Sequence, residues 1–184
     1  RMFRLLQGDV GSGKTIIALI AALNVIKSGF QVALMVPTEI LAKQHYNFAS
    51  DLFGKDISIE LLTGKTDYKQ KKSTLENIKQ NKIKFIIGTH ALFQKKVDYK
   101  NLGLIIIDEQ HKFGVRQRKE LSDKGGNNCD VLVMSATPIP RTMIMTIYGD
   151  MDVTLIKEKP KNRKAITTYS LSLIHISEPT RPYW

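Results

Sequence analysis

Short apolar runs alternate along the chain with longer segments in which apolar residues recur at helical spacing. The apolar runs cover residues 3–7, 31–36, 57–62, 84–87, 104–107, 130–134 and 153–156. Helical spacing covers residues 14–28, 39–53 and 67–81, and Gly29 and Gly54 follow the first two segments as expected C-terminal caps. Several runs are nearly unbroken Val, Ile and Leu, which indicates strands buried on both faces. The pattern therefore predicts an α/β fold in which a mostly parallel sheet carries helices on both faces.

This alternation ends near residue 156 and so marks the predicted domain. The 184 residues are enough for one ordinary domain, which we expect to span residues 1–156. Residues 157–170 begin with a charged, proline-containing stretch, so we expect a linker and the start of a following domain. Residues 171–184 begin LSLIHISEPTR, which resembles translated sequencing-adapter DNA, so we expect a non-native tail.

The net charge of the chain narrows the class of partner that it is expected to bind. The chain has 28 Lys and Arg against 17 Asp and Glu, a formal net charge of +11, which favours nucleic acid, with a membrane surface as the alternative. No apolar run is long enough to cross a membrane and the first residues carry no secretory signal, so we expect a cytoplasmic protein. The single cysteine, Cys129, is interpreted as a small packing residue. His45 and His90 are expected to be polar neighbours, because no partner stands at metal-ligand spacing.

A phosphate-binding loop stands between the first predicted strand and the first helix. It consists of Gly8, Asp9, Val10, Gly11, Ser12, Gly13, Lys14 and Thr15, which match the pattern Gly-x-x-x-x-Gly-Lys-Thr in full. Glycines let the backbone turn tightly and point its N–H groups at phosphate, and the following helix adds its positive end. Lys14 is expected to reach the β- and γ-phosphates of ATP, and the Thr15 hydroxyl to bind Mg²⁺. The alternative is a glycine-rich turn without a ligand.

Hydrolysis at such a loop also requires carboxylates. Asp108 and Glu109 follow the apolar run at residues 104–107, at the carboxyl end of a predicted central strand. Ligands of open α/β sheets bind at this edge. Asp108 is therefore the expected Mg²⁺ ligand, and Glu109 the expected base that orients the attacking water. Taken alone, the pair is equally compatible with a solvated acidic turn.

Three other predicted strands are followed by Thr38, Gly64 and Thr89, so these residues fall on the same edge of the sheet. The predicted contacts to a nucleic-acid strand are Pro37, Thr38, Gly64, Lys65, Thr89 and His90. Hydroxyl and backbone N–H groups bind phosphate oxygens without reading base identity. Lys69, Lys71 and Lys72 add positive charge beside this edge, although a solvated helix face is the alternative interpretation of these lysines.

Longer strings carry a resemblance to a known family. They are RLLQGDVGSGKT at residues 4–15, PTEILAKQH at 37–45, GTHAL at 88–92, DEQHKFGVRQR at 108–118, SATPIPRT at 135–142 and YGDMDV at 148–153. The tetrad Asp-Glu-Gln-His, with the phosphate loop before it and Ser-Ala-Thr after it, resembles helicase superfamily 2. The strings together resemble the RecG-type DNA helicases. Transcription-repair coupling translocases share part of these strings and are the alternative.

The resemblance implies an ATP-dependent DNA helicase or translocase that acts on forks and junctions in recombination and repair. It implies an ATPase site of Lys14, Thr15, Asp108 and Glu109, and a set of coupling residues consisting of Gln110, His111, Ser135 and Thr137. It also implies that the chain is one RecA-like lobe, whose second lobe with arginine fingers and wedge domain for branched DNA are missing from these residues. For the 184 residues alone, we expect a non-catalytic module that binds ATP and DNA.

Deleting residues 171–184 is expected to leave the stability of the protein unchanged, because an adapter-derived peptide was never selected to pack against this core. Thermal unfolding of the full and shortened chains measures the effect. A cooperative loss of several degrees in Tm on deletion would show instead that the segment belongs to the fold.

Overall fold

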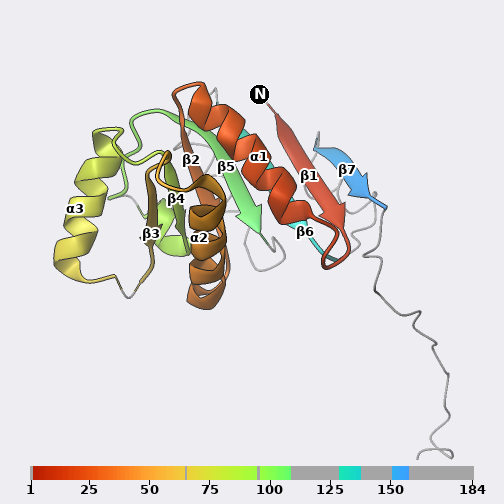
Figure 1. Ribbon diagram of the computed structural model, residues 1–184, viewed down its shortest axis with the longest axis horizontal. Coiled ribbons are helices and arrows are strands. Elements are labelled where there is room, and N and C mark those ends of the chain that lie inside the picture. The colour runs from red at the N-terminus through yellow and green to blue at the C-terminus, as the bar shows by residue number, and fades with distance from the viewer. Residues whose placement is uncertain (1, 65, 95, 109–128, 138–150, 158–184) are drawn as a thin grey trace, which may run out of the picture.

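Seven strands form one sheet in the described part of the chain, in the order β3-β4-β2-β5-β6-β1-β7 (Figure 1). The computed structural model describes residues 2–64, 66–94, 96–108, 129–137 and 151–157. The strands are β1 (Phe3–Gly8), β2 (Gln31–Met35), β3 (Ile59–Leu62), β4 (Phe85–Gly88), β5 (Leu102–Asp108), β6 (Asp130–Ser135) and β7 (Asp152–Ile156). Every neighbouring pair runs parallel, so all the strands end at one edge of the sheet.

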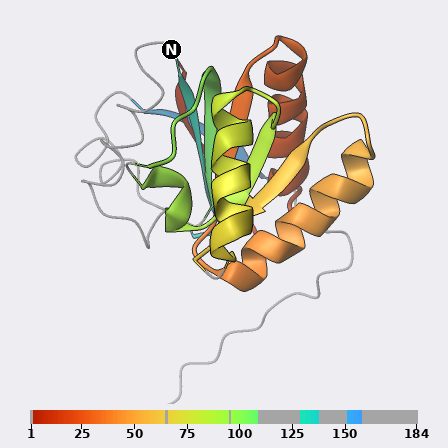
Figure 2. The same cartoon turned by 90° about the vertical axis from the view of Figure 1, so that its left-hand side faces the viewer.

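Helices cover both faces of this sheet. They are α1 (Lys14–Lys27), α2 (Glu39–Phe53), α3 (Tyr68–Lys79) and the short 3-10 helix η1 (His90–Phe93). Buried residues of α1 and α2 pack on one face, and buried residues of α3 and η1 pack on the other. Figure 2 shows α1 and η1 on opposite sides of the sheet. Successive strand residues such as Leu34 and Met35 alternate between the two clusters, which is why the central strands are apolar throughout.

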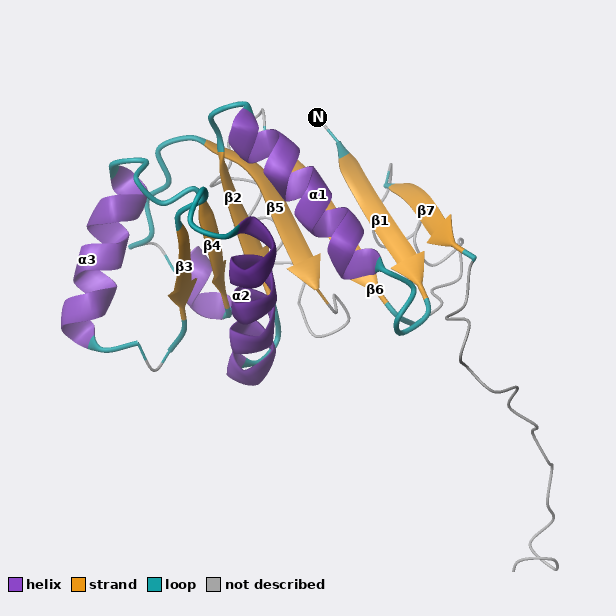
Figure 3. Cartoon of the chain, in the orientation of Figure 1, coloured by secondary structure: helices purple, strands orange, loops and turns teal. Residues whose placement is uncertain are grey.

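The predicted α/β fold is confirmed (Figure 3). Each apolar run is a strand and each segment of helical spacing is a helix, with bounds that differ by no more than two residues at any end. Gly29 and Gly54 have φ angles of 92° and 61°, as expected for glycines that follow helices. Residues 90–93, to which the sequence analysis assigns no helix or strand, form η1. The predicted linker and tail lie outside the described residues, apart from Lys157.

Cys129 is fully buried in the core, in agreement with its interpretation as a packing residue. Among the described residues, no helix has both the length and the apolar composition to cross a membrane.

Gln31 joins four backbone groups at the edge where the strands begin. Its side chain is fully buried. The Nε2 amide donates to the carbonyl oxygens of Ile78 and Ile83, each at 2.9 Å. Its Oε1 accepts from the backbone N–H groups of Lys100 and Asn101, at 3.0 and 3.2 Å. One amide therefore satisfies its own polar atoms and ties β2 to the end of α3 and to the segments that lead into β4 and β5.

Gln31→Glu replaces the donating amide by a carboxylate that faces the carbonyl oxygens of Ile78 and Ile83. With these two acceptors unsatisfied, we expect the free energy of unfolding to fall by about 2–4 kcal/mol. Gln80→Glu is the matched control, because it makes the same change at an exposed position that ends α3. We expect the control to cost less than about 0.5 kcal/mol. Denaturation in urea measures both, and equal losses would contradict the role assigned to Gln31.

Candidate functional site

The carboxyl edge of the sheet gathers the predicted chemistry. β1, β6 and β5 are neighbours and end together, with Gln7 level with Ser135 and Asp108 level with Met134. Neighbouring strands lie about 4.8 Å apart, so the ends of β1 and β5 are about 10 Å apart across β6. The structure thus brings the phosphate loop, which leaves β1, and Asp108, which ends β5, to one stretch of the edge.

The backbone of the phosphate loop requires its glycines. Gly11 and Gly13 have φ angles of 80° and 89°, which residues with a side chain rarely adopt. Gly8 is required for space, because a Cβ there would lie 2.6 Å from Ser12 Oγ and 3.0 Å from Ile156 Cβ. Gly13 is the N-cap of α1. The loop therefore turns directly into the positive end of a fourteen-residue helix.

Polar groups of the loop are gathered around the same turn. Lys14 Nζ donates to the carbonyl oxygens of Gly8 and Asp9, at 2.7 and 2.8 Å, so the ammonium group lies against the loop. Ser12 Oγ is buried and has no hydrogen-bond partner among the described residues. Thr15 is partly buried in the first turn of α1.

These groups fit a nucleotide phosphate with Mg²⁺. An ammonium group, a buried hydroxyl and the N–H groups of a first helical turn are donors that phosphate oxygens can satisfy. Thr15 and Asp108 supply hydroxyl and carboxylate oxygens, the kind of ligand that Mg²⁺ prefers. In the described ranges, no group of three or more His, Cys, Asp or Glu side chains is placed so that it could hold a metal ion.

Asp108 has a partner that no spacing rule predicts. His45, in α2, places its Nε2 atom 3.2 Å from Asp108 Oδ2. Both side chains are largely buried, with exposed fractions of 11% and 16%. The two residues are 63 positions apart, and the only signal in the sequence is that His45 closes the string at residues 37–45.

A second unpredicted contact fastens the turn after β6. Ser135 Oγ accepts from the backbone N–H of Thr137 at 3.2 Å and lies 3.0 Å from Thr137 Oγ1. Gln7, a buried residue of β1, donates from Nε2 to the Thr137 carbonyl oxygen at 3.0 Å. The available signal is a polar residue within the apolar run at residues 3–7. The contact ties the Ser135–Thr137 turn to the strand that leads into the phosphate loop.

The residues predicted to contact a nucleic-acid strand lie on the other half of the same edge. β2, β4 and β3 end level with one another, because Met35 and Leu62 are both paired with Gly88. The residues that follow these strands therefore emerge side by side, next to β5 and the phosphate-loop half of the edge.

Individual positions on this half follow from local geometry. Thr38 is the exposed N-cap of α2, and its Oγ1 accepts from Leu41 N at 3.3 Å. Gly64 lies beside the start of α2, since a Cβ at Gly64 would be 3.6 Å from Glu39 Oε1. Pro37 joins β2 to α2, while Thr89 is the N-cap of η1 and exposed His90 is its first residue. Lys65, Glu109, Gln110 and His111 lie outside the described residues.

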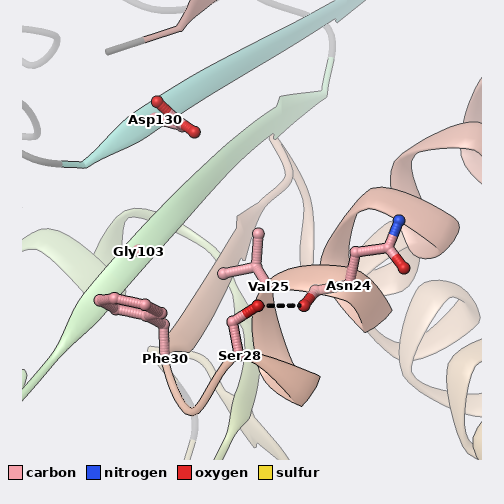
Figure 4. A pocket seen from close by; sticks show the side chains of 6 residues that line it. All are labelled: Asn24, Val25, Ser28, Phe30, Gly103 and Asp130. Atoms are coloured by element: carbon pink, nitrogen blue, oxygen red, sulfur yellow. Dashed lines mark hydrogen bonds between the residues drawn. The ribbon is translucent and has the colours of Figure 1, made fainter.

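A pocket of about 250 Å³ lies at the opposite edge, where the strands begin (Figure 4). It is lined by Asn24, Val25, Ser28, Phe30, Gly103 and Asp130. Phe30 packs against Gly103 so closely that a Cβ at Gly103 would lie 2.7 Å from the Phe30 Cβ and 2.9 Å from its ring carbon Cγ. Ser28 Oγ donates to the Asn24 carbonyl oxygen. The pocket is separate from the loop and carboxylate described above.

Comparisons with known proteins agree with this geometry. The sequence profile described as "DEAD/DEAH box helicase" matches residues 3–146. The ATP-dependent DNA helicase RecG of Aquifex aeolicus (strain VF5) is 57% identical over 170 residues, which make up 91% of this chain and 21% of that protein. The protein of the same name from Bacillus subtilis (strain 168) is 55% identical over 170 residues, which make up 92% of this chain and 25% of that protein.

A solved structure of RecG bound to a three-way DNA junction is similar in fold, with a TM-score of 0.76 and 48% sequence identity. The match covers 90% of this chain and 22% of that one. The resemblance to RecG-type helicases is confirmed by these matches. The chain spans 21% to 25% of the length of the two curated relatives.

Gly88→Ala tests the level ends of β3 and β4. An alanine Cβ at this position would collide with the carbonyl oxygen of Leu62, a backbone atom that cannot rotate away. We expect a loss of about 1–3 kcal/mol in the free energy of unfolding. Gly64→Ala is the matched control on the same edge, because its Cβ would make only an ordinary contact, 3.6 Å from Glu39 Oε1. Thermal unfolding compares the two, and an equal loss in the control would show that the edge is arranged differently.

Proposed function

Because the chain belongs to the DEAD/DEAH box helicase family, we propose that it forms the ATP-binding motor lobe of a RecG-type DNA helicase or translocase. The observation that carries the proposal is the level alignment of β1, β6 and β5, which brings a complete phosphate loop and Asp108 to the same edge of the sheet, with one strand between them. A glycine-rich turn that binds no ligand would not require a carboxylate at the same edge of the sheet.

In this proposal, the loop N–H groups and Lys14 bind the phosphates of ATP. Lys14 exchanges its two contacts with the loop carbonyls for anionic phosphate oxygens, which form stronger, charge-assisted hydrogen bonds. Thr15 and Asp108 hold Mg²⁺, which when bound neutralises charge on the β- and γ-phosphates. Glu109 orients the attacking water, a role proposed from its place directly after Asp108.

DNA is the proposed partner of the other half of the edge. Pro37, Thr38, Gly64, Lys65, Thr89 and His90 are the proposed contacts with the phosphates of one strand. The net charge of +11 supports a polyanionic partner, and contacts to phosphates alone would make the grip independent of sequence. Branched DNA is proposed as the substrate, because the similar RecG structure is bound to a three-way junction.

Coupling between the two halves is proposed for Gln110, His111, Ser135 and Thr137. The contact of Gln7 with the Thr137 carbonyl oxygen supports this, because it joins the Ser135–Thr137 turn to the strand before the phosphate loop. We propose that the whole protein supplies a second RecA-like lobe and a wedge domain for branched DNA, and that it acts in the cytoplasm.

For the 184-residue polypeptide by itself, we propose a module that binds Mg²⁺-ATP and DNA with little catalysis. The observation that favours this second function is that the described residues form one sheet, while the chain spans 21% to 25% of the length of the two curated relatives. Arginine fingers, which the family's second lobe supplies, are worth about 10³ to 10⁵ in rate in related NTPases. Their loss raises the barrier by about 4–7 kcal/mol.

Lys14→Ala is expected to abolish detectable binding of a fluorescent ATP analogue by the 184-residue polypeptide, because it removes the cation that faces the phosphates. Glu109→Gln is expected to leave binding intact and to change an already very slow hydrolysis very little. Fluorescence titration and a steady-state phosphate-release assay, with and without forked DNA, measure these two quantities.

Lys27→Ala is the matched control, since it removes the same side chain at the exposed far end of α1. It should bind the analogue as the unchanged chain does. Robust DNA-stimulated hydrolysis that is lost in the Glu109 variant would mean that one lobe is sufficient for catalysis.

A further inference from the structure

We propose that His45 is a positioning residue that fixes the Asp108 carboxylate. It also connects this carboxylate to the strand-binding half of the edge, the half at the ends of β2, β3 and β4 where contacts with a DNA strand are proposed. This inference rests on the proposed function, because it concerns the carboxylate assigned to Mg²⁺. It adds a residue of α2 to a site otherwise built from β1, α1 and the end of β5.

The contact has one chemically sensible form. A carboxylate is only an acceptor, so the Nε2–H group of His45 donates to Asp108 Oδ2 across 3.2 Å. The exposed fractions of 11% and 16% mean that little water competes for this bond. An Asp108 carboxylate held through Oδ2 keeps its orientation and can still bind a cation through Oδ1.

The packing of α2 explains how a helix residue reaches the end of a strand. Ala42 and Ala49 are fully buried and lie on the same face of α2 as His45, three residues before it and four after it. Their small side chains let the helix approach the sheet closely. As a result, the imidazole ring of His45, the largest side chain of the three, reaches Asp108 at the end of β5.

The same helix begins at the strand-binding edge. Its N-cap, Thr38, is a proposed DNA contact, and Glu39 in its first turn lies next to Gly64. His45 follows Thr38 by seven positions, a rise of about 10 Å along the helix. Because a helix of this length moves as a rigid rod, a phosphate that shifts Thr38 also shifts the donor that holds Asp108. DNA and Mg²⁺ then influence each other's affinity by the same factor.

Three variants separate this role from simple packing. His45→Leu keeps a side chain of similar volume and removes the N–H donor. His45→Gln restores an N–H donor at about the reach of Nε2. Asn47→Leu is the matched control, since it introduces the same residue at an exposed position of the same helix.

The first measurement follows the affinity of the 184-residue polypeptide for a fluorescent ATP analogue as Mg²⁺ is added. The Mg²⁺ midpoint is the concentration at which half of the maximal increase in affinity is reached. Residues that hydrogen-bond a metal ligand typically change metal affinity by about 10- to 100-fold. We expect His45→Leu to raise the Mg²⁺ midpoint by about this factor and to leave the analogue's affinity in EDTA unchanged. His45→Gln should recover most of the loss, and Asn47→Leu should match the unchanged chain.

The second measurement repeats the Mg²⁺ titration with a saturating single-stranded oligonucleotide. The oligonucleotide should move the midpoint of the unchanged chain by about fivefold or more, the lower end of typical coupling between sites. In His45→Leu, this shift should disappear. A midpoint that DNA does not move, or that DNA moves equally in both proteins, overturns the proposed connection.

A normal Mg²⁺ midpoint in His45→Leu overturns the positioning role. The proposed function then stands, provided that the unchanged chain binds the analogue and Lys14→Ala does not. If the unchanged chain binds no analogue even with Mg²⁺, both fail together. If thermal unfolding shows that His45→Leu does not fold, His45→Asn replaces it, because this amide is one carbon shorter than Gln and cannot reach Asp108 Oδ2.

Discussion

The parallel register of β1, β6 and β5 is the constraint on which the candidate site depends. Ladder hydrogen bonds hold these three strand ends level, so the phosphate loop, the Ser135–Thr137 turn and Asp108 cannot separate unless the sheet breaks. A slip of β5 by one residue would carry Asp108 to the other face of the sheet. The site therefore takes its geometry from the backbone ladder, and its side chains only complete it.

The two edges of the sheet have different tasks. At the edge where the strands begin, the side-chain amide of Gln31 donates two hydrogen bonds and accepts two, all with backbone groups of three other segments. At the edge where they end, glycines such as Gly8 and Gly88 leave space for close backbone approach, and Ser12 Oγ has no hydrogen-bond partner among the described residues. Hydrogen bonds of Gln31 thus stabilise the fold at the edge where the strands begin, while Ser12 Oγ at the edge where they end is available for a ligand.

α2 is the element that relates the two halves of the carboxyl edge. It starts at Thr38, beside the ends of β2 and β3, and delivers His45 to the end of β5. Gln7 makes a comparable link between β1 and the turn after β6. The first link joins the helix of a proposed DNA contact to the proposed Mg²⁺ ligand, and the second joins the strand before the phosphate loop to a proposed coupling turn. Each link is a hydrogen bond that a small displacement can break.

Local pattern was enough to predict the strands, the helices and the phosphate loop. Their signals, which are apolar periodicity, a glycine after a helix and eight contiguous loop residues, all lie within a few positions of one another. Parallel strands end at one edge, so even the convergence of that loop with Asp108 followed from the predicted sheet. The contacts of His45, Gln7 and Gln31 were decided by tertiary structure alone. Each joins residues at least 47 positions apart, and depends on strand order, register and the closeness of a helix to the sheet, which only the packing of the whole chain sets.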